Sequence, residues 1–285
     1  MAETFAVASG FHGEKLYQRR ARTVLPILIR QAQAQQPIYY ETLAQEVGMP
    51  NPRNLNYPLG CIGDALNGLA SDWESEIPHI QALVLNQQTG LPGPGFDGFL
   101  KDRKFKWSNP VERRAVIKGY WAQIYTYPYW NDVLQALGLA PTPNALGQII
   151  ERAGHGGGGG EGPAHLRLKT LVSKNPDWVG LKIGSGDGEV EQCLPSGDSV
   201  DVVFFRPNRI HAVEVKPVDA SVRDITRGLF QCVKYRAVLQ ARAAFEHDDR
   251  RISACLALGG PLPVGLIPLR NSLSVEVFEG LDEPA

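Results

Sequence analysis

Val200-Asp201-Val202-Val203-Phe204-Phe205 is an apolar run that carries one carboxylate, and Val213-Glu214-Val215-Lys216-Pro217 is a second apolar run that carries two charges. Both runs are rich in β-branched and aromatic residues and are bounded by proline, glycine or asparagine, which is typical of buried strands. Pro207-Asn208 is a turn signal and predicts that the strands form a hairpin. Glu214 and Lys216 stand two residues apart and leave the same face of their strand. We therefore expect two carboxylates and an amine to converge at one spot.

This predicted cluster of charges has a chemical meaning. Charged side chains are rarely buried unless they are paired or bind a metal. Two carboxylates on a strand pair suit a hard cation such as Mg²⁺, which takes oxygen ligands at about 2.1 Å and keeps several waters. Such a cation can activate a water and stabilise charge on a phosphate, while a neighbouring lysine orients the water or holds the phosphate. The pattern therefore indicates metal-dependent chemistry on a phosphate.

The constellation resembles the PD-(D/E)XK nuclease superfamily, which has the restriction-endonuclease-like fold. Asp201 matches the metal-binding aspartate of the family, Glu214 its second acidic ligand and Lys216 its lysine. Downstream, residues 227–235 resemble a helix with a glutamine and a tyrosine that several branches share. Upstream, residues 161–166 resemble the first helix of the family, whose glutamate often points at the metal. The match covers about residues 161–280.

One departure from the family pattern concerns the residue before the metal-binding aspartate. No proline precedes Asp201, whereas Pro195-Ser196-Gly197-Asp198 brings a proline close to another acid. Asp198 is therefore a rival for the metal-binding position. Asp201 is preferred because it lies inside the apolar strand, while Asp198 sits in a glycine-containing turn.

The resemblance implies a ligand set for a metal ion. Asp201, Glu214, the carbonyl of Val215 and Glu161 would hold Mg²⁺, and Mn²⁺ would substitute for it. An alternative for Glu161 is a carboxylate placed favourably at a helix N-terminus.

The resemblance also implies roles for side chains around the metal. Lys216 and Gln231 would handle the attacking water, although Gln231 can also be read as a polar residue at a helix–sheet boundary. Arg227, Gln231 and Tyr235 share a helix face by their spacing of four. Arg227 and Tyr235 are expected to contact nucleic acid.

The elements expected around the hairpin give the C-terminal half an α/β fold. The patterns predict helices at 163–174 and 223–243, and strands at 188–194, 199–205, 209–217, 252–258 and 273–278. Pro163 suits the first turn of its helix. This order corresponds to a mixed β-sheet flanked by helices, as the restriction-endonuclease-like core requires.

The N-terminal half is expected to be mainly α-helical. Apolar spacing predicts helices at 14–35, with a bend at Pro26, at 41–47 and at 59–69, followed by a strand at 80–85 and a turn-rich loop. This order fits a winged helix-turn-helix. Residues 38–48 and 77–79 also resemble the DNA-binding part of alkyltransferase-like proteins. Those proteins have a reactive cysteine after the proline that matches Pro78, and its absence here leaves only a DNA-binding shape to carry over.

A basic stretch at 101–118 is a candidate nucleic-acid contact. Basic residues interleaved with aromatic ones can hold phosphates and stack on bases, and the alternative is a solvated helix face whose aromatics lie in the core. One or two helices are expected over 111–137. The candidate contacts in this stretch are Lys101, Lys104, Lys106, Arg113 and Arg114, with Phe105, Trp107 and Trp121 among them.

Length and composition set the domain organisation. The chain has 285 residues, which is enough for two domains, and we expect a nucleic-acid-binding domain at 1–150, a glycine-rich linker at 151–160 and a nuclease domain at 161–285. The net charge of −1 leaves any nucleic-acid contact to local patches. The four cysteines show no zinc spacing and are expected to be buried thiols in a reducing cytoplasm. No apolar run approaches a membrane span and no signal peptide is evident, so no membrane partner is expected.

Together these patterns predict a metal-dependent endonuclease that hydrolyses DNA phosphodiester bonds. The expected substrate is double-stranded DNA, cut by a homodimer whose N-terminal domains choose the target. The resemblance favours a restriction or antiviral defence role. A DNA repair or recombination nuclease is the alternative, and a non-catalytic DNA-binding protein that retains the fold is a third possibility.

Overall fold

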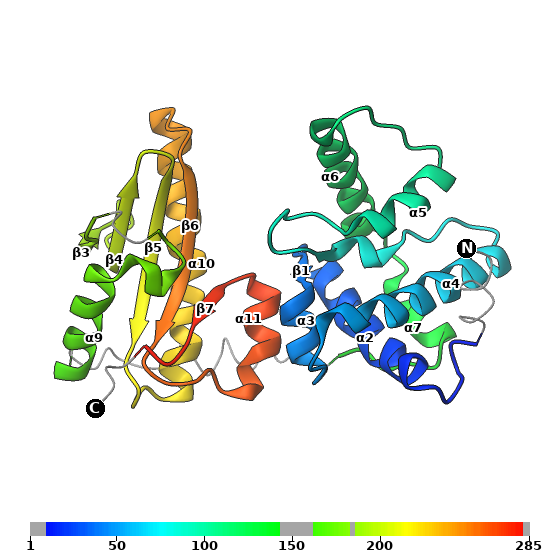
Figure 1. Ribbon diagram of the computed structural model, residues 1–285, viewed down its shortest axis with the longest axis horizontal. Helices are drawn as coiled ribbons and strands as arrows, with labels where there is room; N and C mark the ends of the chain where they lie inside the picture. Colours follow the sequence, from blue (N-terminus) through cyan, green and yellow to red (C-terminus); the bar gives the residue numbers. More distant parts are fainter. Residues whose placement is uncertain (1–9, 143–161, 183–185, 282–285) are drawn as a thin grey trace. The chain divides into compact units, whose positions relative to one another are not determined.

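The computed structural model describes residues 10–142, 162–182 and 186–281 (Figure 1). The chain divides into two compact units, residues 1–144 and 145–285, and each is described by itself. The predicted glycine-rich linker at 151–160 and the candidate metal ligand Glu161 lie outside the described residues.

Three helices predicted in the N-terminal unit are confirmed. They are α2 (Leu16–Gln33), α3 (Tyr40–Glu46) and α4 (Asn56–Asp72). Pro26 lies inside α2, as the sequence indicated. The unit packs around α2, whose Val24, Leu25 and Leu28 are completely buried because its apolar positions recur at helical spacing.

The predicted strand at 80–85 is only partly correct. Residues 84–85 form β2 (Val84–Leu85), which pairs in parallel with β1 (Ile38–Tyr39), but the preceding residues form the 3₁₀ turn η2 (Ile80–Leu83). All four side chains of η2 are buried. A continuous buried run has no alternation, so its periodicity cannot separate a strand from a helical turn.

Further helices lie in the described part of the N-terminal unit. They are η1 (Pro52–Leu55), η3 (Pro94–Phe96), α5 (Asp97–Asp102), α6 (Pro110–Thr126) and α7 (Trp130–Ala136). The Asn109 side chain caps α6 by accepting hydrogen bonds from two backbone N–H groups, each at 3.0 Å. Phe105, Trp107 and Trp121 pack against the core, as the alternative reading of the basic stretch has it, and Trp121 Nε1 donates to the Ala82 carbonyl at 2.8 Å.

The C-terminal unit contains a five-stranded mixed sheet with strand order β3-β4-β5-β6-β7 (Figure 1). The β3–β4 and β4–β5 pairs are antiparallel, and the β5–β6 and β6–β7 pairs are parallel. The predicted mixed sheet and its central hairpin are therefore confirmed. The strands are β3 (Glu189–Cys193), β4 (Ser199–Arg206), β5 (Arg209–Lys216), β6 (Arg251–Leu258) and β7 (Glu276–Phe278).

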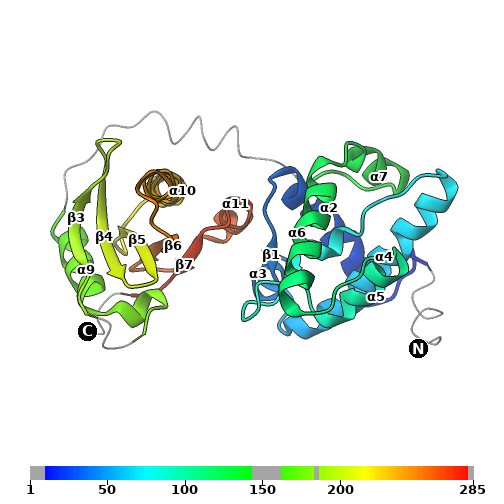
Figure 2. The same cartoon turned by 90° about the horizontal axis from the view of Figure 1, so that it is seen from above.

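Helices cover both faces of this sheet (Figure 2). On one face α9 (Pro163–Lys174) packs Leu168 and Val172 against β4 and β5. On the other face α10 (Val222–Glu246) and α11 (Ile267–Leu273) enclose a second apolar cluster, and short 3₁₀ turns η4 (Pro176–Val179) and η5 (Val264–Leu266) lie between the larger elements. Helix α11 was not predicted, and the last strand begins at 276 rather than 273.

Two further predictions concern the burial of the cysteines and membrane-spanning helices. Cys61, Cys232 and Cys255 are buried and free, as expected, but Cys193 is exposed because it ends the edge strand β3. None of the helices in the described part of the chain combines the length and apolar character needed to cross a membrane.

Candidate active site

Asp201 is fixed at the end of the β4–β5 ladder. This ladder runs from the Arg206–Arg209 pair to the Val202–Val213 pair. Just beyond it, the Asp201 Oδ2 atom accepts a hydrogen bond from the backbone N–H of Val215 at 2.7 Å. The Asp201 carboxylate is therefore held against the C-terminal end of β5, the strand that carries Glu214 and Lys216.

His165 lies at the same point and was not identified from the sequence. Its Nε2 atom is 3.3 Å from Asp201 Oδ2 and 3.0 Å from the Val215 carbonyl oxygen. Two oxygen atoms from neighbouring strands therefore face one point, which a nitrogen of α9 occupies. The sequence carries no local signal for this role, because the partners of His165 lie 36 and 50 residues further along the chain.

Glu214 is buried in a network that involves both carboxylate oxygens. The residue is 2% exposed, and Lys216 Nζ donates to its Oε1 at 2.6 Å. The Tyr235 hydroxyl lies 2.9 Å from Glu214 Oε2 and 3.0 Å from the Ser199 carbonyl, either of which can accept its single proton. Gln231 Nε2 donates to that hydroxyl at 3.1 Å, while Gln231 Oε1 is buried without a partner among the described residues.

The surroundings of Glu214 and Asp201 shift the pKa values of the two carboxyl groups in opposite directions. Burial, followed by repulsion from Asp201, raises the pKa of Glu214 to about 7 against the attraction of Lys216. Burial also opposes ionisation of Asp201, but hydrogen bonds from His165 and the Val215 N–H outweigh it and lower the pKa of Asp201 below its ordinary value. Two neighbouring carboxylates whose pKa values are shifted in opposite directions are typical of functional sites. A bound cation would reduce the repulsion between them.

Gly228 allows α10 to approach the charged pair. A Cβ atom at this position would lie 2.9 Å from Leu256 Cδ1, 3.3 Å from Lys216 Cε and 3.5 Å from Glu214 Cγ. Only a glycine leaves these side chains where they are. This role could not be predicted from the sequence, because the close approach depends on how α10 packs against β5 and β6.

The structure places the remaining candidate residues, Asp198, Arg227 and Tyr235, in different environments. Asp198 is bound to Lys234 Nζ at 2.7 Å and to Ser196 Oγ at 2.6 Å, so the structure brings Asp201 and not Asp198 to the Val215 amide. Arg227 is exposed on α10. Tyr235 is 1% exposed, so the nucleic-acid contact predicted for it is wrong: its hydroxyl is enclosed and holds Glu214.

The candidate basic residues of the N-terminal unit differ in their exposure and in their partners. Lys101, Lys104 and Lys106 are exposed, and so is Arg114, which donates to the Thr89 carbonyl at 3.3 Å. Arg113 instead forms an ion pair with Asp97 at 2.6 Å and donates to the Pro92 carbonyl at 3.0 Å. The phosphate contact predicted for Arg113 is corrected to a structural ion pair, because its guanidinium is occupied within the fold.

The donors at the hairpin are of the kind that Mg²⁺ prefers. A carboxylate oxygen of Asp201 and the carbonyl oxygen of Val215 face one point, and oxygen atoms are the preferred ligands of hard divalent cations. Within the described residues, no three histidine, cysteine, aspartate or glutamate side chains gather closely enough to hold a metal ion. The oxygen donors that fit the cation are thus the Asp201 carboxylate and the Val215 carbonyl, with the Glu214 carboxylate beside them.

Comparisons of the whole chain with family models, with curated proteins and with solved structures yield no match. The geometry of the site therefore carries the functional inference. That geometry combines an ionised carboxylate, a second carboxylate whose pKa is about 7, a lysine ammonium and a buried amide oxygen with no partner among the described residues.

Proposed function

We propose that the protein is a metal-dependent endonuclease that hydrolyses phosphodiester bonds in double-stranded DNA, with a C-terminal unit of the restriction-endonuclease-like kind. One observation carries the proposal: Asp201 Oδ2 and the Val215 carbonyl oxygen face a single point, 3.3 and 3.0 Å from His165 Nε2, beside the Glu214–Lys216 pair. Buried charges that serve only stability are seldom grouped in this way, because each costs desolvation free energy.

Asp201, the Val215 carbonyl and Glu214 are the groups that would hold Mg²⁺, or Mn²⁺ in its place. The cation would supply charge neutralisation at the phosphate and activation of a water. His165 Nε2 lies at the point toward which the Asp201 and Val215 oxygens face. The His165 ring would therefore have to turn for these oxygen atoms to hold a cation.

The remaining side chains orient the reacting groups. Lys216 is held by Glu214 at 2.6 Å, and its ammonium can bind a non-bridging phosphate oxygen or a water. Gln231 Oε1 has no partner among the described residues and can accept a hydrogen bond from the attacking water. Tyr235 fixes the Glu214 carboxylate by its hydrogen bond of 2.9 Å and also receives one from Gln231.

Target choice is assigned in this proposal to the N-terminal unit, acting as a winged-helix-like DNA-binding module. The exposed cations at Lys101, Lys104, Lys106 and Arg114 support this assignment, because phosphate contacts supply most of the affinity for DNA. Two copies of the chain would cut the two strands. A restriction or antiviral defence role suits such a division between target choice and cutting.

Incubation of the full chain with supercoiled plasmid tests the proposal. We expect nicked and linear products with Mg²⁺ or Mn²⁺, none with EDTA, and binding with slow or no cutting in Ca²⁺, because the larger ion positions a water poorly. A structured RNA and a single-stranded DNA of matched length define the substrate class. Tight DNA binding without cleavage in any metal would instead indicate a DNA-binding protein, and equal cleavage in EDTA would exclude the metal-dependent mechanism.

A further inference from the structure

Three arginines lie side by side at the end of the sheet where the β4–β5 hairpin turns. Arg206 of β4 pairs in register with Arg209 of β5, and Arg209 pairs in register with Arg251 of β6. Residues that are directly opposite on neighbouring strands leave the same face of the sheet, so the three side chains share one face. We call these three residues the arginine row. It lies at the opposite end of β5 from Lys216, and the proposed nuclease reaction does not use it.

The arginine row has an excess of positive charge. Like charges that lie directly opposite one another on neighbouring strands destabilise a sheet. No carboxylate in the described part of the chain forms an ion pair with any of the three, whereas Arg242 and Arg250 of the same unit each have one. Glu276 of β7 attracts Arg209 and Arg251 from a longer distance, but one carboxylate cannot neutralise three cations. A bound anion would reduce the repulsion within the row.

Arg209 is held in place by hydrogen bonds that lead from the interior. Its Nε atom donates to the Ser253 hydroxyl at 2.9 Å, and this hydroxyl oxygen lies 2.7 Å from Nδ1 of the buried His211. The two terminal nitrogens of Arg209 donate to none of the described residues. They are therefore oriented before a ligand arrives, which reduces the side-chain entropy that is lost on binding.

The two outer arginines differ in how they are held. The terminal nitrogens of Arg206 donate to the carbonyls of Phe205 at 2.9 Å and Gly186 at 2.7 Å. Its Cζ atom lies 5.0 Å from the centre of the Phe204 ring, so the guanidinium is fixed, but none of these groups carries a net negative charge. Arg251 is exposed, and its guanidinium has no partner among the described residues. The row thus combines a fixed charge, an oriented guanidinium and a free one.

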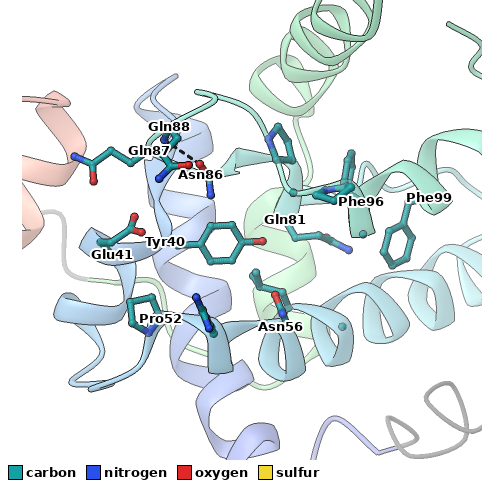
Figure 3. A pocket seen from close by; sticks show the side chains of 17 residues that line it. Tyr40, Glu41, Pro52, Asn56, Gln81, Asn86, Gln87, Gln88, Phe96 and Phe99 are labelled. Carbon is teal, nitrogen blue, oxygen red and sulfur yellow. Dashed lines mark hydrogen bonds between the residues drawn. The ribbon is translucent and has the colours of Figure 1, made fainter. Parts of the chain in front are cut away.

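A pocket of about 870 Å³ in the N-terminal unit has a different balance of charge (Figure 3). The charged residues that line it are one cation, Arg53, and one anion, Glu41, so their formal charges cancel. The arginine row has no such balance. We therefore expect an anion at the row and not in this pocket.

We propose that the arginine row binds phosphate groups. A guanidinium presents N–H donors in a planar fork that matches two oxygens of a phosphate, and it stays charged at neutral pH. Neighbouring strands lie about 4.8 Å apart, so the row extends over about 10 Å and can contact more than one phosphate. Two sources offer this chemistry, the backbone of a nucleic acid and a free oligophosphate. The inference does not rest on the proposed metal site, which lies at the other end of β5.

Two assays on the full chain in EDTA separate the sources, because the proposed nuclease reaction is silent without a metal. Calorimetry measures the binding of tripolyphosphate, and fluorescence anisotropy at increasing salt measures the binding of a short DNA duplex. Arg251→Gln removes the free guanidinium, and Arg209→Gln removes the oriented one. Arg242→Gln is the matched control, since it removes an exposed arginine that is already paired with Glu246. Thermal unfolding in chloride is measured for every variant.

We expect the wild type to bind tripolyphosphate, with an affinity that falls about tenfold or more in Arg251→Gln and in Arg209→Gln and stays unchanged in Arg242→Gln. If a nucleic acid is the source, the slope of log DNA affinity against log salt should also fall by about one unit in each of the first two variants. An unchanged slope would identify the free oligophosphate. The melting temperature of Arg251→Gln should equal or exceed that of the wild type, because a like charge is removed.

Two results would overturn the proposal. One is the absence of tripolyphosphate binding by the wild type. The other is a loss of affinity in Arg251→Gln that is no larger than the loss in the Arg242→Gln control.

Discussion

Glu214 in the C-terminal unit and Gln81 in the N-terminal unit are both almost completely buried, at 2% and 6% exposed, yet their surroundings differ. Both oxygens of Glu214 have hydrogen-bond partners, Lys216 and Tyr235. Neither amide atom of Gln81 has one among the described residues. One unit thus surrounds a buried polar group with its own side chains, while the other leaves it unpaired beside a pocket.

This difference follows from the free energy that it costs to bury a charged group or a neutral polar group without a partner. A buried charge needs partners within the protein even when no ligand is bound, because desolvation of an isolated ion costs several kcal/mol. A neutral amide costs less, so a fold can tolerate it unpaired until a ligand satisfies it. The hairpin thus pairs its buried charge within the protein, whereas the neutral Gln81 amide stays unpaired among the described residues.

The largest expected effect separates the two acids that compete for the metal position. Asp201→Asn should lower Mg²⁺-dependent plasmid cleavage at least about a hundredfold, since it removes the charge of a proposed metal ligand. Asp198→Asn should leave the rate within about twofold, because Asp198 is paired with Lys234 at a turn. Initial nicking rates of both variants provide the measurement. If Asp198→Asn were the inactive variant, the position of Asp201 next to the Val215 amide would have no catalytic meaning.

Alanine substitution of two glycines compares the packing around the two buried groups. Gly228→Ala should destabilise the protein by about 1–3 kcal/mol, because its Cβ meets Leu256 at 2.9 Å and Lys216 at 3.3 Å within a packed core. Gly63→Ala should cost less, because the closest atom, Gln81 Nε2, is the end of a flexible side chain. Urea unfolding of both variants tests the order. Equal losses of stability would show that the pocket is packed as tightly as the hairpin.

The two units should also differ in their response to acid. Burial, followed by the charge of Arg103, lowers the pKa of His79 in the N-terminal unit to about 4 from 6.5. The unfolded chain therefore binds more protons below pH 6.5, and stability that is complete above 6.5 is lost as the pH falls toward 4. At about 1.4 kcal/mol per pKa unit, lowering the pH from 7 to 5 should cost this unit on the order of 2 kcal/mol.

In the C-terminal unit, His211 and Glu214 change the stability in opposite directions as the pH falls. Burial, followed by Arg209 and Arg251, lowers the pKa of His211 to about 3, so this group also loses stability below pH 6.5. The pKa of Glu214 is raised to about 7, so its contribution is present below 4.5 and lost as the pH rises through 7. On lowering the pH from 7 to 5 the two contributions oppose each other, and the N-terminal unit should be the more acid-sensitive one.

Urea unfolding followed by tryptophan fluorescence at pH 7 and pH 5 measures this difference, since four of the five tryptophans lie in the N-terminal unit. His79→Gln should flatten the pH dependence of that unit. An unchanged pH dependence in His79→Gln would mean that other groups dominate the acid response.

The smallest effect concerns the basic stretch. Replacing Lys104 and Lys106 by glutamine should weaken DNA binding and reduce the slope of log affinity against log salt by about one unit per lost phosphate contact. Stability should not change, because both side chains are exposed. Arg113→Gln serves as the contrast: it should lower stability by breaking the Asp97 ion pair and leave the salt slope alone. Salt-titrated fluorescence anisotropy in EDTA distinguishes the two outcomes.

The sequence predicted the hairpin because its signals are local. β-branched residues around Asp201 and Glu214, with Pro207-Asn208 between them, place the two strands side by side without help from distant residues. Helix α9 could be predicted equally well, because Pro163 marks its first turn and its apolar spacing continues to Lys174.

The missed features depend on packing between distant segments. His165 meets Asp201 36 residues later, and nothing in its own surroundings predicts that contact. Tyr235 shares a helix face with Gln231 as expected, but only the packing of α10 shows that it is buried. Helix α11 was missed because it is seven residues long, too short for a periodic pattern to separate it from a loop.

Cleavage of supercoiled plasmid by Glu214→Gln in Mg²⁺, beside the wild type, tests the central claim most directly. The substitution keeps the volume of the side chain and removes the carboxylate that Lys216 and Tyr235 hold. We expect cleavage to fall at least about a hundredfold in a protein that still folds, because the amide keeps the side-chain volume and its oxygen can still accept the hydrogen bond from Lys216. Cleavage at the wild-type rate by a folded Glu214→Gln protein would contradict the assignment of this hairpin as the active site.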